Sequence, residues 1–159
     1  MSSDPVWLDE DEERVWRRWL RLNAELTAAL HRQLQAEAGL SMSDYEVLVD
    51  LTDDPAGRVR VSELAHLLQW ERSRVSHHVT RMERRGLVER EECPDDGRGA
   101  YVAITPAGRT AIERAAPGHA RAVRRLVFDA LQADEVRSLE TAIDKLLAQH
   151  SAPRTLTAT

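Results

Sequence analysis

The chain has 159 residues, a formal net charge of −5 and 42% hydrophobic residues, which is enough for one domain with an apolar core. Its single cysteine, Cys93, excludes a framework of intrachain disulfides, so we expect a reducing, cytoplasmic setting. No apolar run approaches the roughly 18 residues that a membrane helix needs, and the acidic N-terminus differs from the cationic start of a signal peptide.

The first predicted helix runs from about Asp9 to Ala38. Acids in its first turns suit the helix dipole, and Gly39 provides a stop. Apolar residues recur every three or four positions and form one stripe, which Trp16 and Leu20 widen. So long a helix with so wide an apolar face predicts a partner. The residues of the stripe are Val15, Trp19, Leu22, Leu26, Leu30 and Leu34.

Two shorter helices and a strand are expected next. The second helix is capped by Ser41 or Ser43, because Ser43 and Glu46 also have the spacing of a capping box, and it ends in the turn-forming segment 53–57. Residues 58–61 predict a short strand, and Ser62 is expected to cap a third helix over residues 63–69. The inward-facing residues of these helices are expected to be Tyr45, Leu48, Val49, Leu51, Leu64, Ala65, Leu67 and Leu68.

A fourth helix follows a tight turn at residues 70–71 and ends at Gly86. Residues 87–92 and 100–105 alternate as strands do, and the turn-rich segment CPDDGRG joins them. Thr105 and Pro106 mark the start of a fifth helix, which we expect to run towards Leu131 with a kink or break at residues 117–118. A last amphipathic helix is predicted over about residues 134–149.

This order of elements is a winged helix-turn-helix. The predicted fold class is therefore mainly α with a small β-wing, a winged helix-turn-helix flanked by long N- and C-terminal helices. The distribution of charge along the chain distinguishes the fourth helix from the others. Residues 1–13 hold six acids and no base, whereas residues 72–90 hold six arginines and two acids, a local charge of +4. A basic segment in an acidic protein indicates an anionic partner such as nucleic acid.

The fourth helix has two distinct sides. Val75, Val79 and Met82 share one stripe, which we expect to be buried. The opposite side and its shoulders carry hydroxyl, imidazole and guanidinium groups, which reach base edges and phosphates in a major groove. An ordinary solvated helix face is the alternative for this helix alone. The candidate DNA contacts are Arg72, Ser73, Arg74, Ser76, His77, Thr80, Arg81 and Arg84.

The predicted wing tip adds an independent feature. Arg98 stands between Gly97 and Gly99, where a free backbone places a guanidinium at the end of a loop. A single arginine of this kind inserts into a narrow minor groove. Asp96 is placed to brace Arg98, and a plain surface turn is the alternative.

The segment SELAHLLQWERSRVSHHVTRMERRGLVEREECPDDGRGAYVAITPAGR, residues 62–109, resembles the MarR family of transcriptional regulators, which are bacterial and archaeal dimers. The third helix, the recognition helix, the RRGLV exit, the Asp-x-Arg wing and the ITPAG entry recur in order. With the flanking helices, the resemblance spans about residues 15–149. It implies a homodimer whose first and last two helices interlock, and in which each lobe binds half of a pseudo-palindromic site on double-stranded DNA.

The same resemblance implies roles for regions and residues. Residues 1–38 become an N-terminal dimerisation helix, 39–105 the DNA-binding lobe, 106–150 the C-terminal dimerisation helices and 151–159 a flexible tail. Arg98 becomes the minor-groove arginine and Asp96 its brace. The implied function is a transcriptional repressor that a small anionic or phenolic effector releases from DNA. Candidate residues for the effector pocket are Trp16, Arg17, Trp19 and Tyr45, with dimer core as the alternative for the tryptophans.

Other functions have weaker support. Cys93 as a redox sensor is an alternative, but the acids beside it raise the pKa of a thiol and blunt its reactivity. The six histidines lack the spacing of metal ligands, and no nucleophile motif or phosphate-binding loop appears, so we expect no enzyme, metal or cofactor. A winged helix used only for protein contacts is a further alternative, which would not need Arg98 or the polar side of the fourth helix.

Overall fold

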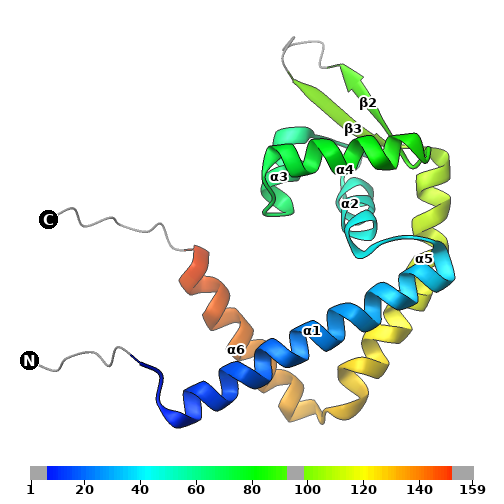
Figure 1. Cartoon of the computed structure of the whole chain (residues 1–159). Coiled ribbons are helices and arrows are strands. Elements are labelled where there is room, and N and C mark those ends of the chain that lie inside the picture. Colours follow the sequence, from blue (N-terminus) through cyan, green and yellow to red (C-terminus); the bar gives the residue numbers. More distant parts are fainter. Residues whose placement is uncertain (1–6, 93–98, 152–159) are drawn as a thin grey trace, which may run out of the picture. The chain divides into compact units, whose positions relative to one another are not determined.

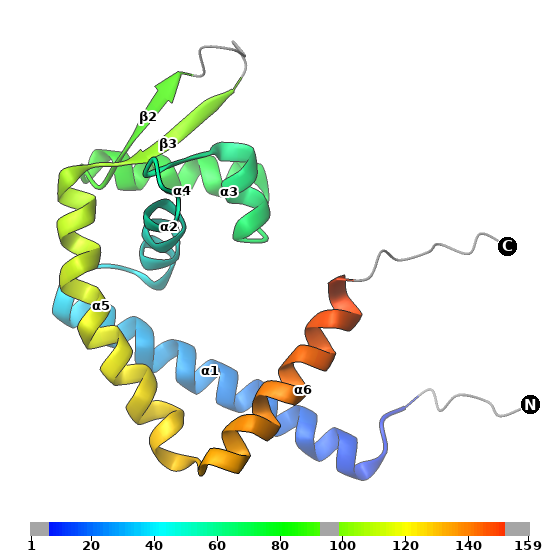
Figure 2. The same cartoon turned by 180° about the vertical axis from the view of Figure 1, so that it is seen from behind.

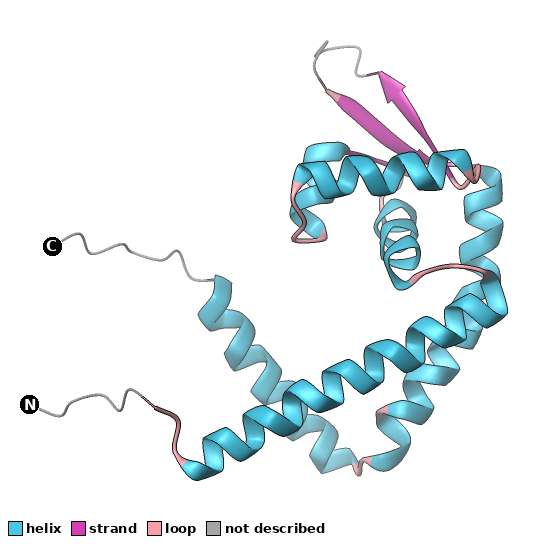
Figure 3. Cartoon of the chain, in the orientation of Figure 1, coloured by secondary structure: helices cyan, strands magenta, loops and turns pink. Residues whose placement is uncertain are grey.

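The computed structural model describes residues 7–92 and 99–151. Helices dominate these residues, and three short strands form an antiparallel sheet (Figure 3). The predicted fold class, mainly α with a small β-wing, is confirmed. The chain divides into two compact units, residues 1–122 and 123–159, and each is described by itself. Among the described residues, none of the helices is both long and apolar enough to cross a membrane.

The first two helices begin and end at local signals. α1 (Glu10–Ala38) starts at a capping box in which the Asp9 side chain accepts from the backbone of Glu12 and the Glu12 side chain accepts from Asp9. It ends at Gly39, whose φ of 66° is left-handed. α2 (Met42–Asp53) has a capping box between Ser41 and Asp44, so the serine nearer the preceding loop is the cap.

The helix-turn-helix follows α2. β1 (Arg58–Arg60) leads directly into α3 (Val61–Leu67), and α4 (Arg72–Arg84) comes after a short turn. The prediction that Ser62 caps α3 is wrong. The helix begins two residues earlier, at Val61, and Arg60 occupies the cap position without a side-chain hydrogen bond. The reason is that the chain passes from strand to helix without an intervening turn.

The wing is a β-hairpin at one edge of the sheet. β2 (Val88–Glu92) pairs with β3 (Ala100–Ile104), and β3 also pairs with β1, so that the strand order is β1-β3-β2. Figures 1 and 2 show β2 and β3 extending together beyond α4.

α5 (Pro106–Leu126) starts where predicted, because the Thr105 hydroxyl accepts a hydrogen bond from the Gly108 backbone at 3.0 Å. The predicted extension towards Leu131 is wrong, since the helix ends at Leu126 and a 3-10 turn (Phe128–Ala130) follows. The helix also passes Pro117 without a break. The next residue, Gly118, packs on the end of α1 so closely that an added Cβ would lie 1.9 Å from the Glu37 carboxylate. Tertiary packing of this kind outweighs the local preference of proline.

One apolar core lies inside the first unit. The predicted stripe of α4 is confirmed, because Val75, Val79 and Met82 are fully buried. Leu67 was predicted to face inward, but half of it is exposed, since α3 is short and only Leu64 and Ala65 reach the core. The other fully buried large side chains are Leu34, Leu40, Val47, Leu48, Leu51, Leu64, Val88 and Val102.

Two apolar faces remain exposed in the isolated chain. One is on the N-terminal half of α1, where Trp16 is 51% and Trp19 46% exposed. The other is on α6 (Ala133–Ser151) in the second unit, where residues 141–150 are all exposed and include Leu146 and Leu147. An exposed apolar patch on this scale is typical of a protein interface.

We expect Gly108→Ala to be more destabilising than Gly118→Ala. A Cβ at position 108 would lie 2.0 Å from the backbone oxygen of Leu87, which cannot move without disturbing the sheet. At position 118 the obstacle is the end of a flexible glutamate side chain. We expect a loss of about 2–3 kcal/mol for Gly108→Ala and under about 1 kcal/mol for Gly118→Ala. Urea unfolding of both variants measures this, and equal losses would contradict the account.

Candidate nucleic-acid interface

The outer side of α4 carries most of the predicted contact residues. Opposite the buried stripe, this side presents short polar and guanidinium side chains to solvent. Thr80 is the exception, because it is half-buried. The exposed members of the predicted set are Arg72, Ser73, Arg74, Ser76, His77, Arg81 and Arg84.

A residue from the wing reaches this helix. The Arg90 guanidinium of β2 donates to the Ser76 carbonyl at 2.9 Å and to the Thr80 hydroxyl at 3.0 Å. Thr80 itself donates to the Ser76 carbonyl at 2.9 Å. Arg90 therefore ties the hairpin to the middle of α4 and adds a cation beside the outer side. Sequence analysis did not include it among the contacts, because the two residues it bonds are 10 and 14 positions away and on another element.

Two arginines of the outer side are held by aromatic neighbours. The Arg74 guanidinium carbon lies 3.9 Å from the centre of the Trp70 ring, in a cation–π contact. Arg81 bonds the Nδ1 atom of His78 at 2.8 Å. These contacts orient both guanidinium groups before any partner binds.

The C-terminal end of α4 is anchored to the first turn of α2 through Asp44, which is almost fully buried. Its Oδ2 atom accepts from Arg85 at 2.7 Å and from the Ser41 backbone at 2.8 Å. Arg85 also donates to the Gly39 carbonyl at 2.7 Å, which closes the end of α1. Arg85, one of the six arginines of the basic segment 72–90, thus joins α4 to the junction of α1 and α2.

His78 completes this anchor on the buried side. Its Nε2 atom lies 3.1 Å from Asp44 Oδ1, which is within ion-pair distance. The two atoms do not form a well-aligned hydrogen bond. A guanidinium can only donate, so the bond from Arg81 makes Nδ1 the acceptor and places the ring proton on Nε2, facing Asp44. Burial alone would raise the pKa of Asp44, but the contacts from His78, Arg85 and Ser41 outweigh it and hold that pKa well below its usual range.

The tip of the wing, with the predicted contact Arg98 and its brace Asp96, lies outside the described residues. So does Cys93. Beside the described part of the hairpin, Arg58 of β1 pairs with Glu91 of β2 at 2.7 Å and packs on the Tyr101 ring of β3 at 4.9 Å. No group of three or more potential metal ligands was found among residues 7–92 and 99–151.

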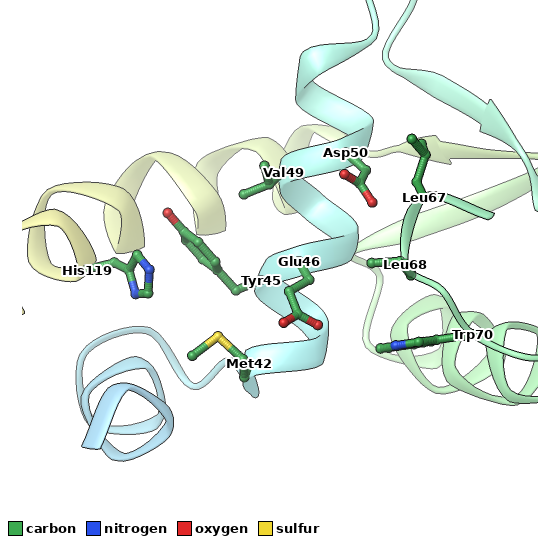
Figure 4. A pocket seen from close by; sticks show the side chains of 9 residues that line it. All are labelled: Met42, Tyr45, Glu46, Val49, Asp50, Leu67, Leu68, Trp70 and His119. Carbon is green, nitrogen blue, oxygen red and sulfur yellow. The ribbon is translucent and has the colours of Figure 1, made fainter. Parts of the chain in front are cut away.

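A cavity of about 520 Å³ lies beside α2 (Figure 4). Its other walls are the segment before α4, which includes Trp70, and His119 of α5. Of the predicted effector residues, Tyr45 lines it. Trp16, Arg17 and Trp19 do not, because they lie on the exposed half of α1. The lining combines apolar, aromatic and titratable side chains, namely Met42, Tyr45, Glu46, Val49, Asp50, Leu67, Leu68, Trp70 and His119.

Comparisons with known proteins agree with this geometry. Residues 40–99 match the family model "MarR family". A MarR family transcriptional regulator of Streptomyces coelicolor, Sco3205, solved in complex with DNA, is 40% identical, with 98% of this chain and 97% of that chain covered and a TM-score of 0.87. The chain belongs to the MarR family.

Two further relatives extend the comparison. The MarR family regulator AbsC from Streptomyces coelicolor is 39% identical, with 92% of this chain and 97% of that chain covered and a TM-score of 0.85. The transcriptional repressor MprA of Escherichia coli is 24% identical over 84% of this chain and 74% of its own length. The MarR family consists of transcriptional regulators and is not an enzyme family, and the winged helix of this MarR protein is of the DNA-binding kind.

Proposed function

We propose that this MarR protein is a homodimeric repressor that binds a pseudo-palindromic operator and that a small-molecule effector releases. The observation that carries DNA binding is the outer side of α4, where hydroxyl, imidazole and guanidinium groups stand in a row on a helix anchored from behind. Such side chains read base edges in a major groove. The complex of Sco3205 with DNA supports the same role here.

The proposed division of labour follows the chain. Residues 39–105 form the DNA-binding lobe, while residues 1–38 and 106–150 form the dimerisation region and 151–159 a tail. The exposed apolar faces of α1 and α6 support this assignment, because a homodimer would cover them. MprA, a relative, is named as a repressor, which supports repression as the mode of action.

We propose that each lobe reads DNA in two ways. Arg72, Arg74, Arg81 and Arg84 neutralise phosphates, and Ser73, Ser76, His77 and Thr80 meet base edges. Arg98, braced by Asp96, enters the adjacent minor groove. The proposed effector binds in the cavity that Tyr45 lines, where its presence alters the position of α4.

The experiment that tests DNA binding is a gel shift with the DNA upstream of the protein's own gene. Binding should need an inverted repeat with half-sites about 10 bp apart. The affinity should fall by about 10³-fold or more between 50 and 200 mM salt, because the arginines of two lobes release counterions on binding. Binding that is indifferent to half-site spacing, or flat with salt, would contradict the proposal.

Substitutions in the recognition helix and in the wing should have different effects on DNA binding. Ser73→Ala or His77→Ala should relax base preference, with a cost of about 1–3 kcal/mol for a strong contact. Arg98→Ala should weaken binding most at sites with AT-rich flanks, whose minor groove is narrow and strongly negative. Adding Asp96→Ala to Arg98→Ala should cost nothing more, because the two residues act as a pair. Fluorescence anisotropy on operators with different flanks measures both effects, and an Arg98→Ala variant that binds all flanks like wild type would remove Arg98 from the interface.

A further inference from the structure

The charged groups that line the cavity beside α2 are of one sign. Glu46 and Asp50 stand one helical turn apart on α2, and Figure 4 shows both carboxylates on the side that faces Leu67, Leu68 and Trp70. None of the nine lining residues is a lysine or an arginine. A small molecule in this cavity therefore meets two carboxylates and no facing cation from the lining.

Neither carboxylate, of Glu46 or of Asp50, has its charge fully balanced by neighbouring cations and hydrogen bonds. Burial raises the pKa of Glu46, the charge of Arg74 lowers it, and the charge of Asp50 raises it. Burial also raises the pKa of Asp50, and the neighbouring Asp53 adds to the rise. The Asp50 Oδ2 atom is buried and has no hydrogen-bond partner. A buried acceptor in this condition is costly, and a positively charged donor beside it would relieve both the missing bond and the unfavourable charge.

The remaining polar groups of the lining are neutral. Burial lowers the pKa of His119, which leaves its imidazole uncharged at neutral pH, and burial raises the pKa of Tyr45, which keeps its hydroxyl proton. The rings of these two residues pack with centres 4.4 Å apart. With Trp70 across the cavity they offer aromatic faces, which accept an apolar body and attract cations.

We propose that this cavity binds a small organic cation, with an ammonium centre beside Glu46 and Asp50 and an apolar or aromatic body against Tyr45, Val49 and Trp70. The proposal rests on the effector part of the proposed function and names its ligand class. An anionic effector, which the family resemblance favours, would place its charge against the two carboxylates. Like charges in a partly buried site repel, so the anion is the disfavoured occupant.

The cavity also has a direct connection to α4. The Trp70 indole that lines it supports the Arg74 guanidinium at 3.9 Å, and its edge meets the His78 ring with centres 5.4 Å apart. An occupant that contacts Trp70 therefore touches the same side chain that orients a proposed DNA contact. This gives the ligand a physical route to the recognition helix.

The test uses the full chain without DNA and three probes of nearly equal shape. They are 1-naphthylmethylammonium, the neutral 1-naphthylmethanol and the anionic 1-naphthoate, titrated by calorimetry at neutral pH. The ammonium should bind about tenfold or more tightly than the alcohol, as expected for a hydrogen bond to a charged group. The carboxylate should bind most weakly of the three.

Variants assign the preference to the two carboxylates. The double variant Glu46→Gln/Asp50→Asn should bind the ammonium and the alcohol equally, and its retained affinity for the alcohol shows that the cavity is intact. The single variants should each lose part of the preference, which keeps the test decisive if the double variant does not fold. Glu113→Gln, the same kind of change at an exposed site of α5 outside the lining, should behave like wild type.

Three results would overturn the proposal. They are a 1-naphthoate affinity equal to or above that of the ammonium, no binding of the ammonium at millimolar concentration, and a preference that survives in the double variant. Because DNA is absent, a failure here leaves the operator-binding proposal standing. Conversely, a chain that does not retard operator DNA can still pass this test.

Discussion

Asp44→Ala should lower the free energy of unfolding by about 2–4 kcal/mol. The variant loses the N-terminal capping box of α2 and removes the carboxylate that lies 3.1 Å from the buried His78 ring. It also removes the ion pair between Arg85 and α2. The half-exposed Arg85 side chain can then be solvated by water, so the loss of stability is smaller than for a fully buried ion pair. Urea unfolding at neutral pH and fixed protein concentration measures the change.

The same interaction should depend on pH in a defined direction. The native pKa of Asp44 is held below its usual value, so its contribution is complete above the unfolded-state pKa of about 4 and is lost as the pH falls through the native pKa. The gap in unfolding free energy between wild type and Asp44→Asn should therefore shrink below about pH 4. Asp53→Ala, at the exposed end of the same helix, is the control and should change stability by under about 0.5 kcal/mol. A gap that stays constant with pH would show that the carboxylate charge is not what holds α4.

The double variant Trp16→Asp/Trp19→Asp should be a monomer and should bind operator DNA about 10²-fold or more weakly than wild type. Both tryptophans lie on the exposed apolar face of α1, which the proposed dimer covers. Two charges placed there would be buried without partners. A monomer has one lobe only, so it loses the gain in affinity that comes from binding two half-sites at once. Sedimentation velocity measures the mass, and anisotropy measures the affinity.

A matched control separates the interface from general damage to the helix. Ala24→Asp/Ala28→Asp also adds two acids to α1, at exposed positions on the opposite side of the helix from Trp19. This variant should remain dimeric and should keep most of its affinity for DNA. If the tryptophan variant sediments as a dimer, the N-terminal half of α1 is not the dimer interface.

The anchor at Asp44 suggests how a recognition helix keeps its position. The outer side of α4 has to stay open for DNA, so the orientation of the helix is set from its buried side, from its C-terminal end and from the wing. Arg85 binds the junction of α1 and α2, His78 packs beneath the helix, and Arg90 reaches its middle from the wing. A movement of α2 would therefore change the position of α4.

Much of the fold was predictable because its signals are local. The period of apolar residues located α1 and α4, and the buried stripe of Val75, Val79 and Met82 follows from it. Gly39 and Thr105 act as end and start signals for helices, as predicted, because their effects depend only on nearby backbone. The ordered motifs of residues 62–109 also sufficed to recognise the family.

The tertiary structure decided what depends on residues that are distant in sequence. Arg85 lies 41 positions from Asp44, and no local pattern shows that it serves as an anchor rather than as a phosphate contact. The unbroken course of α5 past Pro117 accompanies its close packing on α1, where a neighbouring glycine lets the two helices approach. The charge of the cavity arises in the same way. Glu46 and Asp50 are ordinary helix-face acids in the sequence, and only the fold places them in one cavity with Trp70, where partial burial raises the pKa of both carboxyls.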